Sequence, residues 1–91
     1  MTVRVLRELP DPGPFTTGAT YCLALAGGRH YRVQTLICAQ YPDIKQTLIF
    51  PADERGWPPD WARFLCLNGM DREAALAELD RRTAARPRRA A

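Results

Sequence analysis

Apolar and polar side chains alternate along residues 2–9, which is typical of a short strand with one buried face. Residues 21–25 and 31–39 are rich in β-branched and aromatic side chains, and they flank Gly27-Gly28, a pair suited to a hairpin turn. A further strand is predicted over residues 44–50, after Tyr41-Pro42-Asp43-Ile44, where the fixed φ of proline suits a type I turn. The sequence therefore predicts three or four antiparallel strands, with the position of the first one left open.

The length of the loop at Gly27-Gly28 decides which side chains share a face of the sheet. A loop with an even number of residues would place Leu23 on the same face as Arg32. A three-residue loop that includes Arg29 instead gathers the large side chains at odd positions from 21 to 37 on one face. Because a slip of one residue moves every side chain to the other face, the more segregated pattern is favoured, and we predict the three-residue loop.

The next hairpin joins residues 31–39 to residues 44–50. We predict an even loop there, which places Ile37 opposite Leu48 and Thr35 opposite Phe50. The apolar face then continues across three strands.

The chain changes character at Pro51. Residues 51–59 (PADERGWPP) are predicted to form a loop, because the two prolines at its end cannot take part in a ladder of hydrogen bonds. Two helices are predicted after this loop, one from Asp60 to a stop at Asn68-Gly69 and one capped by Asp71. Their apolar stripes are formed by Trp61, Phe64 and Leu65 and by Ala75, Leu76 and Leu79.

The predicted fold class is α+β, with an antiparallel sheet of three to four strands and two C-terminal helices packed on one face. The 91 residues are enough for one small domain, which we assign to residues 1–83. Five arginines and no acidic residue stand in residues 81–91, whereas the whole chain has a net charge of +3. We expect residues 84–91 to form a disordered, arginine-rich tail, because no side chain there can be buried.

Composition argues against membrane and secreted classes. No run of eighteen apolar residues is present, as a membrane-spanning helix would require. Arg4, Arg7 and Glu8 stand where a signal peptide would need its apolar segment. Three widely spaced cysteines are too few, and odd in number, for a disulfide scaffold. We therefore expect a soluble cytoplasmic protein whose cysteines are reduced and buried.

The residues that could perform catalysis are few and scattered. The three cysteines and His30 match the ligands of a zinc site only in number. In the predicted register, His30 and Cys38 each lie about 13 Å from Cys22, whereas the ligands of one zinc converge within about 4 Å. The same separation argues against a cysteine nucleophile activated by His30. The acidic residues at positions 53, 54 and 60 are expected to be solvated, so we predict no enzyme activity, metal or cofactor.

Two aromatic residues in loops, Trp57 and Tyr41, are candidate anchors for a protein partner, because Trp and Tyr dominate the energetics of many interfaces. Leu36 and Ile49 are predicted to lie among polar neighbours on the open face of the sheet, where they would form a moderate apolar patch. The partner can be a second copy of the chain, because small domains gain buried area by forming homodimers.

Nucleic-acid binding is the alternative prediction. Arginines in the tail could contact phosphates, and basic residues on the open sheet face could extend that surface. The candidate residues are Arg32, Lys45, Arg81, Arg82, Arg86, Arg88 and Arg89. Exposed aromatic residues for base stacking are missing from the predicted open face, which makes this the second choice.

The segment QTLIFPADERGWPPDW (residues 46–61) and the later DREAALAEL resemble short uncharacterised proteins of actinobacteria and their phages. The resemblance covers about a third of the chain and depends on the FPADE…DW motif. It implies a small accessory protein of a phage or mobile element, with no known activity. In physical terms the motif is a corner after a strand that ends at Phe50, where Asp53 can cap the turn through its own side chain. The leading prediction is therefore a non-enzymatic, protein-binding accessory module.

Overall fold

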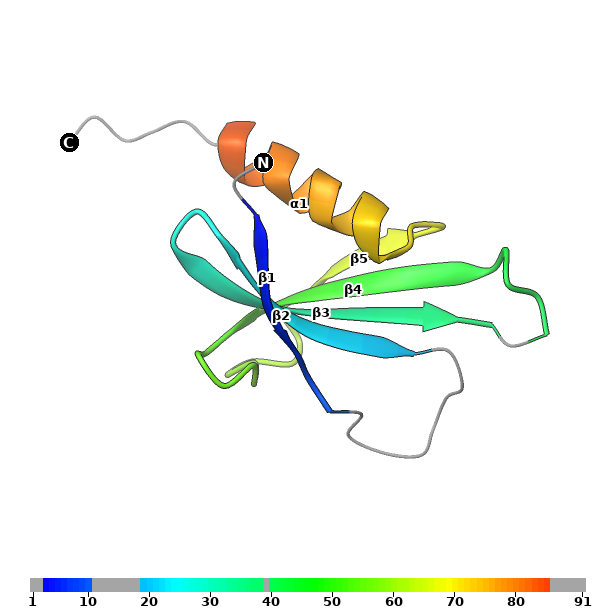
Figure 1. Ribbon diagram of the computed structural model, residues 1–91, viewed down its shortest axis with the longest axis horizontal. Coiled ribbons are helices and arrows are strands. Elements are labelled where there is room, and N and C mark those ends of the chain that lie inside the picture. Colours follow the sequence, from blue (N-terminus) through cyan, green and yellow to red (C-terminus); the bar gives the residue numbers. More distant parts are fainter. Residues whose placement is uncertain (1–2, 11–18, 39, 86–91) are drawn as a thin grey trace.

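Five strands form one antiparallel sheet in the order β1-β2-β3-β4-β5, and a single helix follows them. The computed structural model describes residues 3–10, 19–38 and 40–85 (Figure 1). The elements are β1 (Arg4–Glu8), β2 (Thr20–Ala26), β3 (Arg29–Ile37), β4 (Lys45–Ala52), β5 (Leu65–Asn68) and α1 (Arg72–Ala85). The α+β class is confirmed, but the sheet has five strands and the described residues contain one helix instead of two.

The turn between β2 and β3 contains only Gly27 and Gly28, whose φ angles are +58° and +79°. Two successive positive φ values are typical of a type I′ turn, whose twist matches that of the flanking strands. Ala26 therefore pairs with Arg29, and Leu23 pairs with Arg32. The predicted three-residue loop is wrong, because it assumed that only one face of the sheet is covered.

The hairpin between β3 and β4 has the opposite parity to the prediction. Ile37 pairs with Lys45 instead of Leu48, and Thr35 pairs with Thr47 instead of Phe50. The predicted turn at residues 41–44 is confirmed, because the amide of Ile44 donates to the carbonyl of Tyr41 at 2.8 Å. The turn sits inside a longer connection, which the amide of Cys38 closes by donating to the carbonyl of Ile44 at 2.9 Å.

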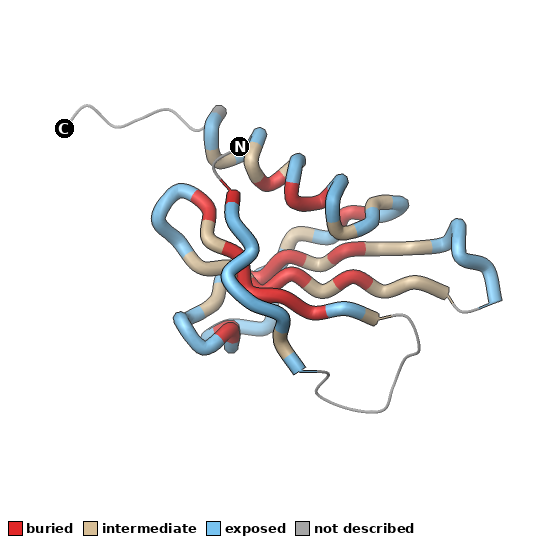
Figure 2. Tube along the Cα trace, in the orientation of Figure 1, coloured by how far each residue is buried: buried red, intermediate tan, exposed pale blue. Residues whose placement is uncertain are grey.

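Helix α1 covers one face of the sheet, and the main core lies between them (Figure 2). Asp71 caps the helix as predicted, since its carboxylate accepts from the amide of Ala74 at 2.9 Å. The predicted apolar stripe of this helix is also confirmed. Its buried members are Ala75, Leu76 and Leu79, which pack against Cys22, Ala24, Val33, Ile49 and Leu67 of the sheet.

The first predicted helix is wrong: after a single turn the chain forms β5. Asp60 accepts from the amide of Ala62 through its side chain at 2.9 Å, but no helix follows. Leu65 and Leu67 alternate with polar residues, so this segment also fits a strand, and it completes the edge of the sheet beside β4. Gly69 has the predicted positive φ, +78°, but it ends this strand.

Strand β1 is the other edge of the sheet and pairs with β2 through an irregularity between Val5 and Arg7. Glu8, at the end of β1, forms a two-pronged ion pair with Arg72 of α1, with N–O distances of 2.6 and 2.7 Å. The hydrogen bond from Arg72 lowers the pKa of Glu8 below its ordinary value. This partly exposed pair joins the N-terminal strand to the start of the helix.

Helix α1 continues to Ala85, two residues beyond the predicted end of the domain, and the tail residues 86–91 lie outside the described residues. Within the described residues, no helix has the length and apolar character needed to cross a membrane.

The type I′ turn gives a first test. We expect Gly28→Val to lower the free energy of unfolding by about 1–2 kcal/mol, because a side chain at positive φ is strained. An added Cβ atom would meet nothing within 4 Å, so the effect comes from the backbone alone. Gly28→Asn is the matched control and should cost much less, because asparagine tolerates this conformation. Urea denaturation measures both, and equal losses would contradict the assigned turn.

The Glu8–Arg72 pair gives a pH-dependent prediction. The pKa of Glu8 is lower in the folded chain than its ordinary value. The ion pair therefore stabilises the fold fully above the ordinary glutamate pKa, and this stabilisation is lost as the pH falls through the folded-state pKa. We expect Glu8→Gln to cost about 0.2–1 kcal/mol at pH 7, as for other solvent-screened pairs, and the difference from wild type to narrow below about pH 4. Denaturation curves against pH measure this, with Glu54→Gln on an exposed loop as control. A difference that does not change with pH would contradict the pair.

Candidate functional site

Part of the face of the sheet away from α1, around Arg32, is covered by the connection between β4 and β5, residues 53–64 (Figure 1). This connection begins with a tight turn at Asp53. The carboxylate of Asp53 accepts from the amides of Arg55 at 2.8 Å and Trp57 at 3.0 Å. These bonds, that to Trp57 foremost, lower the pKa of Asp53. The predicted capping role of Asp53 is confirmed, and the turn holds Trp57 in a defined place.

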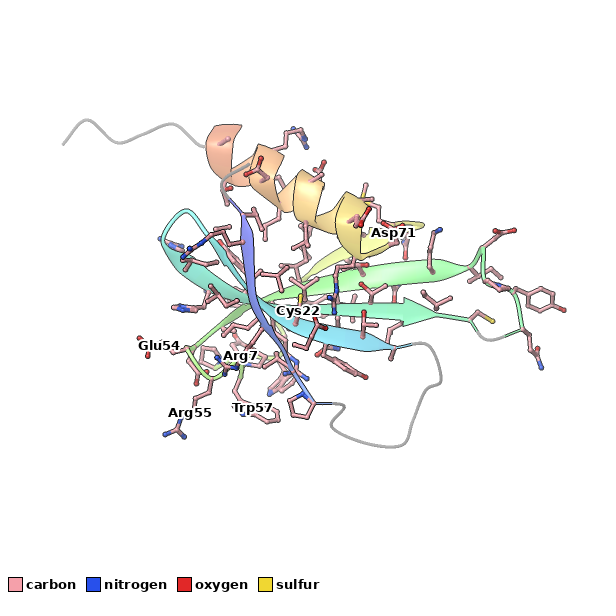
Figure 3. The ribbon with its side chains drawn as sticks, viewed as in Figure 1. Arg7, Cys22, Glu54, Arg55, Trp57 and Asp71 are labelled. Atoms are coloured by element: carbon pink, nitrogen blue, oxygen red, sulfur yellow. The ribbon has the colours of Figure 1, made fainter. Side chains whose placement is uncertain are left out.

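Gly56 allows this turn to approach both β1 and β3. Its φ is +89°, and a Cβ atom there would lie 2.8 Å from a methyl carbon of Leu9. Arg7 of β1 also donates to the backbone carbonyl of Glu54 at 3.3 Å, so the N-terminal strand and the turn lie together (Figure 3). A larger residue at position 56 would be strained at this positive φ and would force the Leu9 side chain to shift.

Arg32 of β3 lies beneath this turn and is only 2% exposed. Its Nε donates to the side-chain carbonyl of Gln34 at 2.7 Å, and its Nη1 donates to the carbonyl of Gly56 at 3.1 Å. Its Nη2 is buried and has no hydrogen-bond partner. Among the residues that the structure describes, no carboxylate forms an ion pair with Arg32. Burial accordingly lowers the pKa of this guanidinium.

Three aromatic rings surround the Arg32 guanidinium. Its Cζ lies 5.2 Å from the ring centroid of Tyr21, 5.2 Å from that of Trp57 and 5.8 Å from that of Trp61. At such distances the negative face of each ring attracts the cation, more strongly where water is excluded. The rings therefore provide part of the compensation that a carboxylate would give to a buried charge.

The same rings continue into an exposed aromatic cluster. Buried Phe50 contacts Trp61 and Phe64, both at centroid distances of 5.3 Å, and Trp61 lies 6.2 Å from Trp57. Trp57, Trp61 and Phe64 are each 49% exposed, and we call these three residues the aromatic surface. About half of each side chain is therefore open to solvent.

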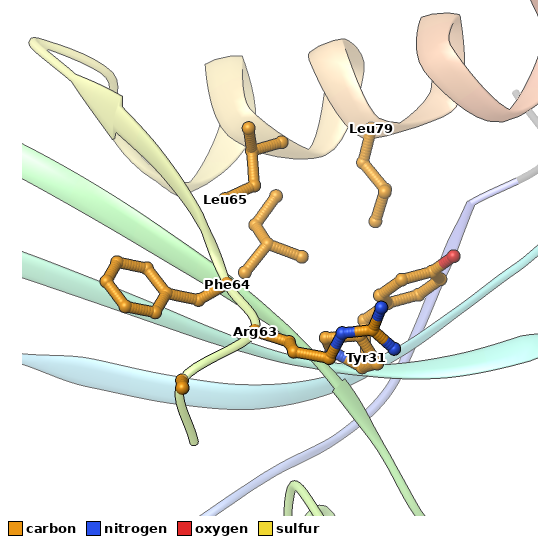
Figure 4. A pocket seen from close by; sticks show the side chains of 8 residues that line it. Tyr31, Arg63, Phe64, Leu65 and Leu79 are labelled. Atoms are coloured by element: carbon orange, nitrogen blue, oxygen red, sulfur yellow. The ribbon is translucent and has the colours of Figure 1, made fainter. Parts of the chain in front are cut away.

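A pocket of about 410 Å³ lies between the sheet and the C-terminal half of α1 (Figure 4). Leu65 and Leu79 line it from opposite sides, and Tyr31 and Arg63 supply its polar atoms. Phe64 also lines this pocket, but its ring packs on Phe50, on the face of the sheet away from α1, so the pocket and the aromatic surface lie on opposite faces of the sheet.

The structure separates the four residues predicted to bind a protein. Trp57 is half-exposed on the aromatic surface, whereas Tyr41, 62% exposed, lies beyond the opposite end of β4 (Figure 1). The eight residues of β4 place about 25 Å between these regions, so Trp57 and Tyr41 are not neighbours. Leu36 is half-buried on the face away from α1. The prediction for Ile49 is wrong: it is buried in the core beneath α1, because the hairpin register is reversed.

The basic residues predicted to bind nucleic acid do not form one exposed strip. Arg32 is buried, so its predicted place on an open basic face is wrong. Lys45 is half-buried at the start of β4. Arg81 and Arg82 are exposed, but both pair with Glu78 and lower its pKa to about 2. The remaining candidates, Arg86, Arg88 and Arg89, lie outside the described residues.

The three cysteines differ in their surroundings. Cys22 is fully buried under α1, and this burial raises the pKa of its thiol. Cys38 is half-buried, and Cys66 is exposed, so the expectation that all three are buried is wrong. Within residues 3–10, 19–38 and 40–85, no group of three His, Cys, Asp or Glu residues lies close enough to hold a metal ion.

Comparisons of the chain with protein-family models, curated proteins and solved structures find no match. The site is therefore argued from its geometry. The sequence interpretation missed Trp61 and Phe64, which it assigned to the core side of a helix. The sequence holds no clear signal for them, because the spacing of Trp61, Phe64 and Leu65 fits a helix, and the prolines at positions 58 and 59 restrict only themselves and the residues before them.

The Asp53 turn can be tested directly. We expect Asp53→Ala to increase the rate of hydrogen exchange at the Trp57 amide about tenfold, because that amide loses a charged acceptor. NMR measures this exchange and reports at the same time whether the core amides remain protected. Glu54→Ala, which removes a neighbouring carboxylate, should leave the Trp57 amide unchanged. Equal effects in the two variants would contradict the assigned turn.

Proposed function

We propose that this chain is a non-enzymatic protein-binding module whose contact surface is the aromatic surface of Trp57, Trp61 and Phe64. The observation that carries the proposal is the grouping of three half-exposed aromatic side chains on one connection. Large aromatic residues in a cluster are enriched among the few residues that dominate binding energy. A soluble chain rarely exposes such a group without a partner.

The way in which the rings are held supports a recognition role. Trp57 is fixed by the Asp53 turn and by Arg32, and Trp61 is fixed by Phe50 and Arg32. Binding then requires little further ordering of these side chains, and the loss of side-chain entropy is a main cost of association.

The proposal includes a cellular setting. The FPADE…DW motif, which forms the corner between β4 and the aromatic surface, supports an accessory role in a phage or mobile element. A reducing cytoplasm suits the partly accessible thiols of Cys38 and Cys66, which would otherwise oxidise. A second copy of the chain is one candidate partner, because β1 and β5 are the outer strands of the sheet.

A nucleic-acid partner is the second candidate, because exposed tryptophans can also stack on the bases of a single strand. Three carboxylates on the same connection weigh against it, since such proteins attract phosphates with a positively charged groove. These carboxylates belong to Asp53, Glu54 and Asp60.

Affinity capture from a lysate of the natural host tests the proposal. We expect the wild-type chain to retain one stoichiometric protein with or without nuclease treatment. Trp57→Ala and Phe64→Ala should each reduce its recovery at least about tenfold, as for central interface residues. Tyr41→Ala is the matched control, because it removes an equally exposed aromatic residue at the other end of the molecule.

Two outcomes would overturn this function. Loss of the captured protein after nuclease treatment would favour the nucleic-acid candidate. Capture that is unaffected by both Trp57→Ala and Phe64→Ala would exclude the aromatic surface. Sedimentation at increasing protein concentration identifies the case in which the partner is a second copy of the chain.

A further inference from the structure

The most unusual group in the molecule is the Arg32 guanidinium. It is buried on a sheet face, and two of its three nitrogens are bonded only to neutral carbonyl oxygens, those of Gln34 and Gly56. The third nitrogen, Nη2, is buried without a hydrogen-bond partner, although a guanidinium carries five donors. Buried charges in proteins are normally paired with an opposite charge. The described residues leave this cation without one.

The covering of Arg32 is thin on one side only. Tyr21 lies on the sheet and is itself buried, so it closes the inner side of the site. Trp57 and Trp61 lie on the connection and are half-exposed, so they are the side chains that separate the guanidinium from solvent. Their ring centroids are 6.2 Å apart. A partner atom reaches Arg32 only if the Trp57 side chain, which Arg32 and the Asp53 turn otherwise hold in place, moves aside, so this contact carries the cost of a rotamer change that contacts with the outer faces of the rings do not.

We propose that the aromatic surface takes an acidic side chain of a protein partner, an aspartate or glutamate flanked by apolar residues, whose carboxylate pairs with Arg32. This inference rests on the proposed function and names the chemistry of the partner. The apolar neighbours of the acidic residue would cover Trp57, Trp61 and Phe64. The carboxylate would supply the missing acceptor for Nη2, in the planar geometry that guanidinium and carboxylate groups share.

Local charge favours a single carboxylate over a polyanion. The connection that carries the tryptophans holds the carboxylates of Asp53, Glu54 and Asp60 against the cations of Arg55 and Arg63, so its net charge is −1 and it offers no positively charged groove to a chain of phosphates. An isolated acidic residue with apolar neighbours brings only one negative charge to the surface. Exclusion of water by the rings then strengthens its attraction to Arg32.

A library of random dodecapeptides displayed on phage provides the probe. Selection against the wild-type chain should yield peptides with Asp or Glu at one position between aromatic or aliphatic residues. For a synthetic peptide from this set, replacement of the acid by its amide should weaken binding to the wild-type chain at least about tenfold, as for a buried charged hydrogen bond. This comparison of the acid and amide peptides uses only the wild-type protein, so its result does not depend on whether any variant folds.

Variants of the protein then locate the contact. Against Arg32→Met, the acid and amide peptides should bind within about twofold of each other, because their difference depends on the guanidinium. Arg55→Met is the matched control on the same connection and should retain the full difference. Circular dichroism and denaturation identify any variant that does not fold, and Arg32→Lys offers a second variant that keeps the charge but loses the planar geometry.

The outcomes separate this inference from the proposed function. Selected peptides that depend on Trp57 and Phe64 but show no preference for an acid would overturn the role of Arg32 and leave the protein-binding function in place. Two results would overturn both the role of Arg32 and the protein-binding function: selected peptides whose binding depends on neither Trp57 nor Phe64, or a selection that yields no peptides. Binding of a twelve-nucleotide oligothymidylate that requires Trp57, in the absence of peptide binding, would assign the site to phosphate.

Discussion

The two-residue turn at Gly27-Gly28 determines which side chains share each face of the sheet. Because it pairs Leu23 with Arg32, it places a charged group in a row of large apolar side chains on the face away from α1. The guanidinium must then be covered by a segment that supplies aromatic rings and also a hydrogen-bond acceptor. The connection between β4 and β5 provides both, through Trp57, Trp61 and the carbonyl of Gly56. The aromatic surface is the outer side of this cover, so its position follows from the turn.

Features controlled by neighbouring residues were predicted correctly from the sequence. The turn at residues 41–44, the cap at Asp71, the apolar stripe of α1 and the carboxylate turn at Asp53 each depend on a few adjacent side chains. The strand register failed because it depends on what lies above and below the sheet. A pattern that separates large from polar side chains is favoured only when one face is exposed to water. Here α1 covers one face, and the connection covers the part of the other face that surrounds Arg32.

The segment from Trp61 to Leu67 shows why the candidate site was only partly predicted. Trp61, Phe64 and Leu65 have the spacing of a helix, whereas Leu65 and Leu67 have that of a strand. Pairing with β4 decides in favour of the strand, and a single sequence does not reveal that the edge of β4 is available for this pairing. Once β5 forms, Trp61 and Phe64 belong to the connection instead of a core stripe, and they join Trp57. Trp57 was identified from the sequence because its neighbours Gly56 and Pro58 indicate a loop whatever the strands on either side do.

Burying an arginine beneath a loop carries a large free-energy cost of desolvation. Replacing buried ionic groups by well-packed apolar residues is often neutral or stabilising, so packing alone does not account for a guanidinium at this position. The charge does two things that an apolar side chain cannot. It attracts the faces of three rings and so sets the orientation of Trp57 and Trp61, and it leaves one nitrogen without an acceptor behind them. Orientation serves any aromatic contact surface, whereas the unpartnered nitrogen gives that surface a preference among partners, because it favours those that bring a negative charge.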